Sequence, residues 1–245
     1  MPKKLENKIA IVTGASKGIG AAIVKALAAE GAAVVVNYSS SKEAAEKIVA
    51  DVSAAGGRAI AVKANVSKLA DIEHLFSETK KAFGRLDILV NNAGMYAGAP
   101  IGSITEESFH KHFDLNVLGL ILASQEAVKY FGPEGGVIVN VSSVVAKLSP
   151  PGITVYSATK GAVDSVTRSF SRELADRNIR VNAVNPGLIA TEGVHAAGFV
   201  SDPSEPSPLG RIGKPEDIAP IVVFLASDDS RWINGEVHYA TGSLI

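Results

Sequence analysis

A tyrosine and a lysine in the stretch VYSATKGAV, Tyr156 and Lys160, carry side chains that can exchange a proton. They stand at i and i+4, so a helix places them on one face. A free tyrosine has a pKa of about 10, and a neighbouring ammonium favours the tyrosinate. We therefore expect Lys160 to lower the pKa of Tyr156 and to make it an acid–base group. Such a pair on its own is more often a surface aromatic and a solvated lysine. A catalytic role therefore needs support from other residues.

Two more polar residues could complete an acid–base site. Ser143 ends the run GGVIVNVSS, and its hydroxyl could hold a substrate oxygen. We prefer it to Ser142, because side chains alternate along a strand and Ser142 would point to the other side. Asn116 lies in a long segment with helical character, 105–131. Together these groups could move a proton to and from a substrate oxygen.

A glycine-rich loop follows the first apolar run. The stretch IAIVTGASKGIGAAI places Gly14, Gly18 and Gly20 after a predicted strand and at the start of a predicted helix. Glycines there let the backbone approach a pyrophosphate, whose charge then lies at the helix N-terminus. Turns need glycine in any case, so the cluster alone is weak evidence. In the first strand–helix unit of an alternating chain it indicates a dinucleotide site.

The acidic residue that usually selects NAD is absent. In an NAD site the second strand commonly ends in Asp or Glu, which contacts the ribose. This chain has Asn37 there, followed by Ser39, Ser40 and Lys42, and Lys17 lies in the glycine loop. A cation with several hydroxyls suits an added 2′-phosphate, although the serines could simply cap the next helix. We expect NADP (NADPH) to be preferred, with NAD as an alternative.

Short β-branched runs alternate with helix-length segments along the whole chain. The predicted strands are KIAIVTG, AAVVVNY, RAIAVKANV, LDILVNNAG, GGVIVNVSS, IRVNAVNPG and GEVHYATG, and the predicted helices are 18–30, 41–55, 68–83, 105–131, 156–177 and 215–227. Several strands are apolar on both faces, as in a parallel sheet covered by helices. We predict an α/β fold: a single doubly wound (Rossmann) domain over 1–245, with a seven-stranded parallel sheet and helices on both faces. The proline-rich segment 188–214 is predicted to be a substrate lid.

Six short motifs stand in a fixed order along the chain. They are TGASKGIG at 13–20, NNAG at 91–94, Asn116, VSS at 141–143, YSATK at 156–160 and NPG at 185–187. Their order and spacing resemble the short-chain dehydrogenase/reductase family over essentially the whole chain. The closest resemblance is to bacterial 3-oxoacyl-carrier-protein reductases and glucose dehydrogenase-like carbonyl reductases. It implies an NAD(P)-dependent enzyme that acts on CH–OH and C=O groups and is usually a homotetramer.

The resemblance implies roles for individual positions. Asn116, Ser143, Tyr156 and Lys160 form the expected catalytic set, with Lys160 also holding the nicotinamide ribose and Asn116 supporting a proton relay through water. The expected cofactor contacts are Gly14, Ser16, Lys17, Gly18, Ile19, Gly20, Asn37, Tyr38, Ser39, Ser40, Asn65, Val66, Asn92, Ala93, Gly94, Tyr156, Lys160, Pro186, Gly187, Ile189 and Thr191. The expected substrate pocket consists of Met95, Tyr96, Val145, Leu148, Ile153 and Leu188.

These expectations lead to an NADPH-dependent carbonyl reductase, or alcohol dehydrogenase in the reverse direction. Ser143 polarises the carbonyl oxygen and Tyr156 protonates the alkoxide. A mostly apolar pocket suits a hydrophobic ketone or aldehyde better than a free sugar. A 3-oxoacyl-thioester reductase and a glucose-type dehydrogenase remain as alternatives. An acidic carrier protein would favour a basic rim, which Arg172 and Arg177 could supply and Glu134 would oppose. A non-catalytic NADP-binding regulator is disfavoured, because it has no need of all four catalytic residues.

The composition excludes several classes of protein. No cysteine is present, which excludes disulfides and thiolate nucleophiles, and the formal net charge is −1. Neither nucleic acid nor a membrane is expected as a partner. We expect a soluble cytoplasmic protein with a small-molecule substrate and no metal. His110 and His112 are expected on the surface, and His195 is the one histidine that could touch a substrate.

Overall fold

The computed structural model of the chain describes residues 3–192 and 207–245. Its strands form a parallel sheet in the order β3-β2-β1-β4-β5-β6-β7, which confirms the predicted fold class. The strands are β1 (Ile9–Val12), β2 (Ala33–Tyr38), β3 (Arg58–Lys63), β4 (Ile88–Asn91), β5 (Gly136–Val141), β6 (Ile179–Pro186) and β7 (Val237–Ala240). Each of them lies within one of the predicted runs.

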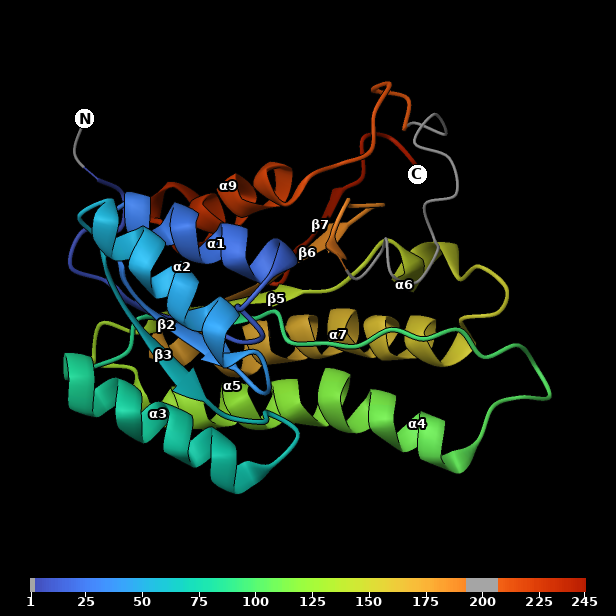
Figure 1. Ribbon diagram of the computed structural model, residues 1–245, viewed down its shortest axis with the longest axis horizontal. Helices are drawn as coiled ribbons and strands as arrows, with labels where there is room; N and C mark the ends of the chain where they lie inside the picture. Colours follow the sequence, from blue (N-terminus) through green and yellow to red (C-terminus); the bar gives the residue numbers. More distant parts are fainter. Residues whose placement is uncertain (1–2, 193–206) are drawn as a thin grey trace.

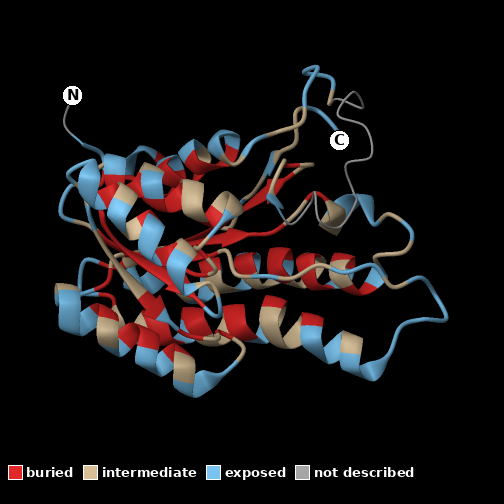
Figure 2. Ribbon diagram, viewed as in Figure 1, coloured by how far each residue is buried: buried red, intermediate tan, exposed pale blue. Residues whose placement is uncertain are grey.

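Helices cover both faces of the sheet. They are α1 (Gly18–Ala29), α2 (Lys42–Ala54), α3 (Leu69–Phe83), α4 (Glu106–Phe113), α5 (Gly119–Tyr130), α6 (Val145–Leu148), α7 (Thr154–Glu173) and α9 (Pro215–Ala226). α1, α2 and α9 lie on one face, and α3, α5 and α7 on the other (Figure 1). The helix sides toward the sheet are buried and the outer sides exposed (Figure 2). The central strands are therefore covered on both faces, which is why they are apolar throughout.

The order of the strands reverses between β1 and β4. The chain continues from β1 toward β2 and β3 on one side, and from β4 toward β5, β6 and β7 on the other. In sheets of this kind ligands bind beside the carboxyl ends of the strands at the reversal. The glycine loop, the NNAG loop and Ser143 all follow carboxyl ends at this edge.

The segment predicted as one helix over 105–131 contains a π-helical turn. This turn, Asp114–Leu118, joins α4 to α5. Such turns are rare inside α-helices and are frequent at functional sites. Asn116 lies within the turn and is buried. Gly119 follows it and packs so closely on the backbone of Val66 that a side chain would not fit there.

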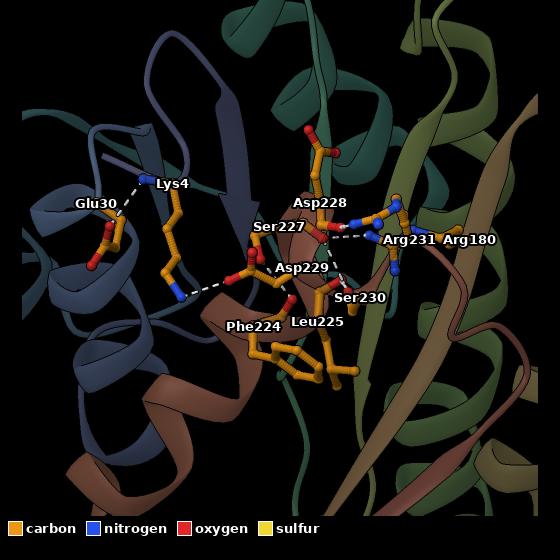
Figure 3. A network of polar contacts seen from close by, with 10 residues as sticks. All are labelled: Lys4, Glu30, Arg180, Phe224, Leu225, Ser227, Asp228, Asp229, Ser230 and Arg231. Atoms are coloured by element: carbon orange, nitrogen blue, oxygen red, sulfur yellow. Dashed lines mark hydrogen bonds and ion pairs between the residues drawn. The ribbon is translucent and has the colours of Figure 1, made fainter. Parts of the chain in front are cut away.

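A network of polar contacts fastens the opposite edge of the sheet (Figure 3). Lys4 donates its backbone N–H to the carboxylate of Glu30 (3.0 Å) and its ammonium to Asp229 (2.6 Å). Arg180, on β6, donates to the carbonyl oxygen of Ser227 (3.0 Å). These contacts connect the N-terminal segment, the end of α1, β6 and the loop after α9. The amino edge of the sheet is therefore stabilised by contacts between elements, whereas the candidate site lies at the carboxyl edge.

One histidine does not lie where the sequence predicts. His110 is exposed, as expected, but His112 is only 2% exposed, so its predicted surface position is wrong. His112 is the buried residue of α4, a helix that packs against α7, and its Nδ1 lies 2.7 Å from the carbonyl oxygen of Ser108. The face of a short helix that becomes buried depends on its neighbour, which periodicity does not identify.

The charged residues considered for a basic rim do not lie at the carboxyl edge. Arg177 follows α7 and donates to the carbonyl oxygen of Val128 on α5, and Arg172 lies in the last turn of α7. Glu134 precedes β5. Loops that lead from a helix into a parallel strand lie at the amino edge of the sheet, opposite the glycine loop. None of these three charges can border the site.

Part of the predicted lid, 188–214, lies outside the described residues. These are 193–206, which include His195. Across residues 3–192 and 207–245, no helix is both long and apolar enough to cross a membrane. The same described residues contain no group of three or more His, Asp or Glu side chains that could hold a metal ion.

Candidate active site

The loop between β1 and α1 has a backbone that favours glycine. Gly14 and Gly18 have φ angles of 60° and 56°. A Cβ on Gly20 would lie 2.5 Å from Nδ2 of Asn92 and 2.8 Å from the carbonyl oxygen of Gly14. Side chains at these positions would strain or block the loop. The glycines therefore keep the loop tight at the N-terminus of α1, as binding of a pyrophosphate requires.

Asn37 braces this loop from β2. It is 1% exposed, its Oδ1 accepts from the N–H of Gly14 (3.1 Å), and its Nδ2 donates to the carbonyl oxygen of Ala64 (3.0 Å). The amide is thus engaged by backbone groups on both sides. Asn37 reaches the wall of the cavity described below, but its side chain holds the glycine loop against β2 and the residues after β3.

Thr13 and Asn92 hold the same loop from the side of β4. The hydroxyl oxygen of Thr13 accepts from the N–H groups of Asn92 and Ala93, each at 3.0 Å. Nδ2 of Asn92 donates to the carbonyl oxygens of Thr13 (2.9 Å) and Gly14 (3.0 Å). Thr13 is not among the predicted site residues, although it belongs to the quoted TGASKGIG motif. These contacts make the glycine loop and the NNAG loop one rigid unit.

A cavity of about 390 Å³ lies over the glycine loop. The predicted cofactor residues that line it are Gly14, Ser16, Lys17, Gly18, Ile19, Gly20, Asn37, Tyr38, Ser39, Ser40, Asn65, Val66, Asn92, Ala93, Gly94 and Thr191. Its other lining residues are Ser41, Ala64, Tyr96, Leu115 and Glu192. Most of the predicted dinucleotide site therefore meets at one hollow.

Five predicted cofactor contacts do not line this cavity. They are Tyr156, Lys160, Pro186, Gly187 and Ile189. Gly187 and Ile189 line a second cavity of about 600 Å³, formed with residues 207–218 and the C-terminal segment. The backbone N–H of Gly187 donates to the carbonyl oxygen of Ala240 (3.0 Å).

The cavity has a polar rim at the end of β2. Lys17, Ser39 and Ser40 are exposed there. Asn65, at the far wall, uses its Oδ1 to accept from the N–H (3.1 Å) and hydroxyl (2.8 Å) of Ser67. The rim thus offers one ammonium and two hydroxyls to a ligand, whereas the amide oxygen of Asn65 is already engaged.

The hydroxyl of Ser143 lies close enough to the phenol of Tyr156 to act on it as a hydrogen-bond partner, which lowers the pKa of that phenol. Ser143 follows β5, and its Oγ also accepts from the N–H of Val145 (3.3 Å), at the start of α6. Ser142 points the other way and donates to the carbonyl oxygen of Lys160 (3.2 Å). The alternation of side chains thus directs Ser143 toward the tyrosine and Ser142 into the protein.

Lys160 is buried one helical turn beyond Tyr156. Its Nζ donates to the carbonyl oxygen of Val141 (2.9 Å) and lies 5.8 Å from the centroid of the Tyr156 ring. Burial lowers the pKa of Lys160 to about 8, while Asp164 acts in the opposite direction. Lys160 can therefore exchange its proton much closer to neutrality than an ordinary lysine.

The pKa of Tyr156 shifts in the direction opposite to the prediction. Burial of the phenol raises it, the hydrogen bond with Ser143 lowers it, and the neighbouring Tyr96 raises it further. Burial disfavours the charged phenolate, and the ammonium of Lys160 points at a carbonyl oxygen of the backbone. The prediction that Lys160 brings this pKa below its ordinary value is therefore wrong. Tyr156 keeps its proton at neutral pH.

Asn116 joins the loop after β4 to α7. Its Oδ1 accepts from the N–H of Met95 (2.9 Å), and its Nδ2 donates to the carbonyl oxygen of Met95 (2.9 Å) and to the hydroxyl of Thr159 (3.1 Å). A Cβ on Gly94 would lie 3.3 Å from Oδ1 of Asn116 and 3.7 Å from Nζ of Lys160. Asn116 and Lys160 therefore meet across Gly94, beside the cavity.

The predicted substrate residues come from loops that meet in front of Tyr156. The ring centroids of Tyr96 and Tyr156 are 6.0 Å apart. The N–H of Ala99 donates to the carbonyl oxygen of Gly152 (2.7 Å), which joins the loop after β4 to the loop before α7. Of the other predicted residues, Met95, Val145 and Ile153 are partly buried, Leu148 is exposed and Leu188 lines the second cavity.

Comparisons with known proteins agree with this geometry. A family model described as enoyl-(acyl carrier protein) reductase matches residues 14–243. A protein of Methylorubrum extorquens named as an uncharacterized oxidoreductase is 54% identical, over 98% of this chain and 99% of its own. A hydroxynaphthalene reductase-like protein of Metarhizium brunneum is 38% identical, over 100% of this chain and 97% of its own.

A solved structure extends the likeness to three dimensions. The short chain dehydrogenase of Burkholderia cenocepacia J2315, in complex with NADP, has a TM-score of 0.92 and 38% sequence identity to this chain. The match covers 98% of each of the two chains. Fold, motifs and relatives agree: this chain belongs to the short-chain dehydrogenase/reductase family of oxidoreductases.

Proposed function

We propose that this oxidoreductase uses NADPH to reduce apolar ketones and aldehydes to alcohols, and that it catalyses the reverse oxidation. The observation that carries the proposal is that three groups come together: the Ser143 hydroxyl acts on the Tyr156 phenol, and Nζ of Lys160 lies 5.8 Å from the centroid of the tyrosine ring. These groups lie at the carboxyl edge of the sheet, next to the glycine loop.

The cavity over the glycine loop suits a dinucleotide. A Cβ at Gly20 would collide with Asn92 and the backbone of Gly14, so glycine lets the loop fold tightly at the start of α1, where a pyrophosphate could lie. Lys17, Ser39 and Ser40 suit a 2′-phosphate, and the Burkholderia relative has NADP bound. When bound, the reduced nicotinamide supplies the hydride. In the protein, Lys160 would hold the adjoining ribose, and Asn92, Ala93 and Gly94 would border the cofactor.

The chain's own residues then handle the oxygen and its proton. The hydroxyls of Ser143 and Tyr156 hydrogen-bond to the carbonyl oxygen of the substrate and increase its polarisation. Tyr156, which is protonated at neutral pH and whose pKa burial raises further, donates that proton as the alkoxide forms. Lys160 stabilises the resulting phenolate by its charge. Asn116 fixes the loop beside Lys160 and supports a proton relay from solvent.

The lining of the site favours an apolar substrate. Tyr96 presents an aromatic ring near Tyr156, and Met95, Val145 and Ile153 supply further apolar surface. A relative is named hydroxynaphthalene reductase-like, so aromatic ketones belong among the candidates. Arg172 and Arg177 cannot form the basic rim that would favour an acidic carrier protein, because they lie at the amino edge of the sheet. This makes 3-oxoacyl-carrier-protein reduction and sugar oxidation the weaker alternatives.

The test is NADPH oxidation, followed at 340 nm, with matched panels of substrates. The panels contain aliphatic and aromatic ketones, aldehydes, 3-oxoacyl thioesters and, because of the family model, an enoyl thioester; glucose is tested with NADP⁺. We expect the highest kcat/KM with apolar ketones or aldehydes. A higher kcat/KM with the thioesters or with glucose would show that the proposed substrate class, apolar ketones and aldehydes, is wrong. Tight NADPH binding without turnover of any substrate would favour a non-catalytic regulator.

A further inference from the structure

A buried carboxylate lies behind the candidate active site. Asp164 is 6% exposed and follows Lys160 by one helical turn on α7. Nδ2 of Asn185, on β6, donates to both of its carboxylate oxygens (3.3 and 3.1 Å). The hydroxyl of Ser142 is a further hydrogen-bond partner. A carboxylate is seldom this deeply buried unless it is paired, so these contacts require an explanation.

Each partner of Asp164 leads to a catalytic group. Asn185 also donates to the carbonyl oxygen of Ser143 (3.1 Å), and therefore holds the backbone that carries the catalytic hydroxyl. Ser142 lies within reach of the carbonyl oxygen of Lys160 (3.2 Å). Asp164 itself interacts through its charge with the Lys160 ammonium. One carboxylate thus connects the end of β5, the end of β6 and the catalytic helix.

The groups that face Asp164 favour its ionised form. Lys160 and Arg168 on α7 are positive, and Ser142 and Asn185 offer hydrogens. From β7 the phenol of Tyr239 faces the carboxylate; Lys147, on α6, lies 5.5 Å from the centroid of that phenol ring. Burial opposes ionisation and, as the largest effect, raises the pKa of the Asp164 carboxyl above its ordinary value.

The hydroxyl of Ser142 can donate its hydrogen to the Asp164 carboxylate without leaving the carbonyl oxygen of Lys160 unpaired. It has a single hydrogen, which can go to Asp164 or to the carbonyl oxygen of Lys160. That carbonyl lies inside α7, where helical geometry supplies a hydrogen bond from the backbone N–H four residues later. The hydroxyl hydrogen is therefore available to an ionised Asp164.

We propose that Asp164 is a positioning residue of the active site, whose buried carboxylate sustains the positive charge of Lys160 and anchors the strand end that carries Ser143. Lys160 is buried and its ammonium donates to the backbone carbonyl of Val141, in a setting where a cation is unfavourable without a counter-charge. Asp164, one helical turn further along α7, supplies that charge. The inference rests on the proposed function for its kinetic consequences, but its electrostatic part concerns the protein alone.

Asp164→Asn separates charge from hydrogen bonding. Asparagine can still accept from Asn185 and Ser142, so the strand end stays anchored, but the counter-charge of Lys160 is lost. We expect the alkaline limb of kcat/KM for carbonyl reduction to move to lower pH. Activity at pH 6 should stay within about threefold of wild type, whereas at pH 8 it should fall by roughly tenfold. Asp164→Ala, which also removes the anchor, should lose activity at both pH values.

The control is Asp176→Asn, which makes the same change at an exposed aspartate just beyond α7. It should leave the pH profile unchanged. A purely structural role of Asp164 predicts instead that Asp164→Asn loses activity by the same factor at pH 6 and pH 8. That result, or a profile identical to wild type, would overturn the proposal.

Two measurements by NMR need no turnover. The titration of Lys160, followed through ¹³Cε-labelled lysine, should have a lower midpoint in Asp164→Asn than in wild type; equal midpoints would contradict the proposal. In the unaltered protein the ¹³Cγ shift of Asp164 should show a carboxylate between pH 6 and 8. A protonated carboxyl over this range would overturn the proposal even if the variant does not fold. If wild type reduces no carbonyl compound, the proposed function fails while these titrations still decide the role of Asp164.

Discussion

Lys160 combines two properties that conflict in most proteins, since it is buried and yet has to carry a positive charge beside a phenol. Its pKa of about 8 means that the ammonium persists below that pH and is lost above it. Tyr156, whose pKa is raised by burial, holds its proton over the same range. The reducing direction needs both protons, one to stabilise charge and one to transfer. These protonation states are the ones that the proposed reduction requires at neutral pH.

We predict that kcat/KM for carbonyl reduction falls as the pH rises through about 8, because Lys160 loses its proton there. The sign follows from a base with a lowered pKa: the charged form is complete well below 8 and absent well above it. Steady-state kinetics from pH 6 to 10 would measure the limb. Lys47→Gln, at an exposed lysine of α2, should leave it in place. A profile flat to pH 10 would contradict the assigned role of Lys160.

At the residue scale, the sequence predicts which side chains lie close together better than it predicts their pKa values. The i, i+4 spacing predicts that Tyr156 and Lys160 share a helix face, and the strand end together with the family resemblance predicts that Ser143 lies beside them. The direction of the Tyr156 pKa could not be read in the same way, because it depends on how deeply the phenol is buried. Asp164 and Thr13 also escaped prediction, since a single Asp or Thr in an apolar context has no distinctive pattern.

Among the elements, the first turn of α1 and helix α7 have glycines for different reasons. Gly20 leaves no room for a Cβ, whereas Gly161, inside α7, has no atom within 4 Å of the position that a Cβ would take. Gly161→Ala should raise the free energy of unfolding by about 0.5–1 kcal/mol, because alanine loses less entropy in a helix. Gly20→Ala should lower it by about 1–3 kcal/mol through overlap with Asn92 and Gly14.

Urea denaturation of the two variants and of wild type tests this pair. Both changes add one methyl group, so the comparison isolates the surroundings of each glycine. Gly20→Ala should also weaken NADPH binding, while Gly161→Ala should not. Equal stability of the two variants would show that the glycine loop is less tightly packed than its contacts indicate.

The elements themselves were largely predictable, because apolar runs and helical segments alternate in a regular way. Each predicted strand formed, and the helix ends differ by a few residues, as at α7, which begins at Thr154 and ends at Glu173. The π-helical turn at Asp114–Leu118 was not predictable, since one extra residue inside a helix leaves no mark in the periodic pattern. The short helix α6 was missed because four residues are too few for a periodic pattern.

For the whole molecule, the cofactor should act as a stabilising ligand. Binding to the folded state alone raises the free energy of unfolding by about 2.7 kcal/mol at 100 times Kd. We predict a larger increase in Tm with NADPH than with NADH at equal concentrations, because Lys17, Ser39 and Ser40 suit a 2′-phosphate. Thermal scans of Lys17→Gln and Ser39→Ala should show the difference shrinking. A larger increase with NADH would reverse the cofactor assignment.

Three expectations at this scale stay predictions. The homotetramer follows from family resemblance, and the single domain over 1–245 and the lid over 188–214 follow from the pattern of the sequence. The described chain contains apolar residues near its C-terminal end that remain exposed, among them Tyr239, Leu244 and Ile245. The sequence does not show whether another copy of the chain covers these exposed apolar residues. The oligomeric state is therefore less predictable from the sequence than the residues of the site or the elements of the fold.

Proton donation by Tyr156 is the central claim, and Tyr156→Phe tests it most directly. The variant keeps the aromatic ring and the packing against Tyr96 but lacks the acid. We measure oxidation of bound NADPH in a single turnover with the best ketone, and NADPH affinity by fluorescence titration. The account predicts a loss of at least about a hundredfold in the rate, with the Kd for NADPH changed less than about threefold. A variant that oxidises NADPH at the wild-type rate would contradict it.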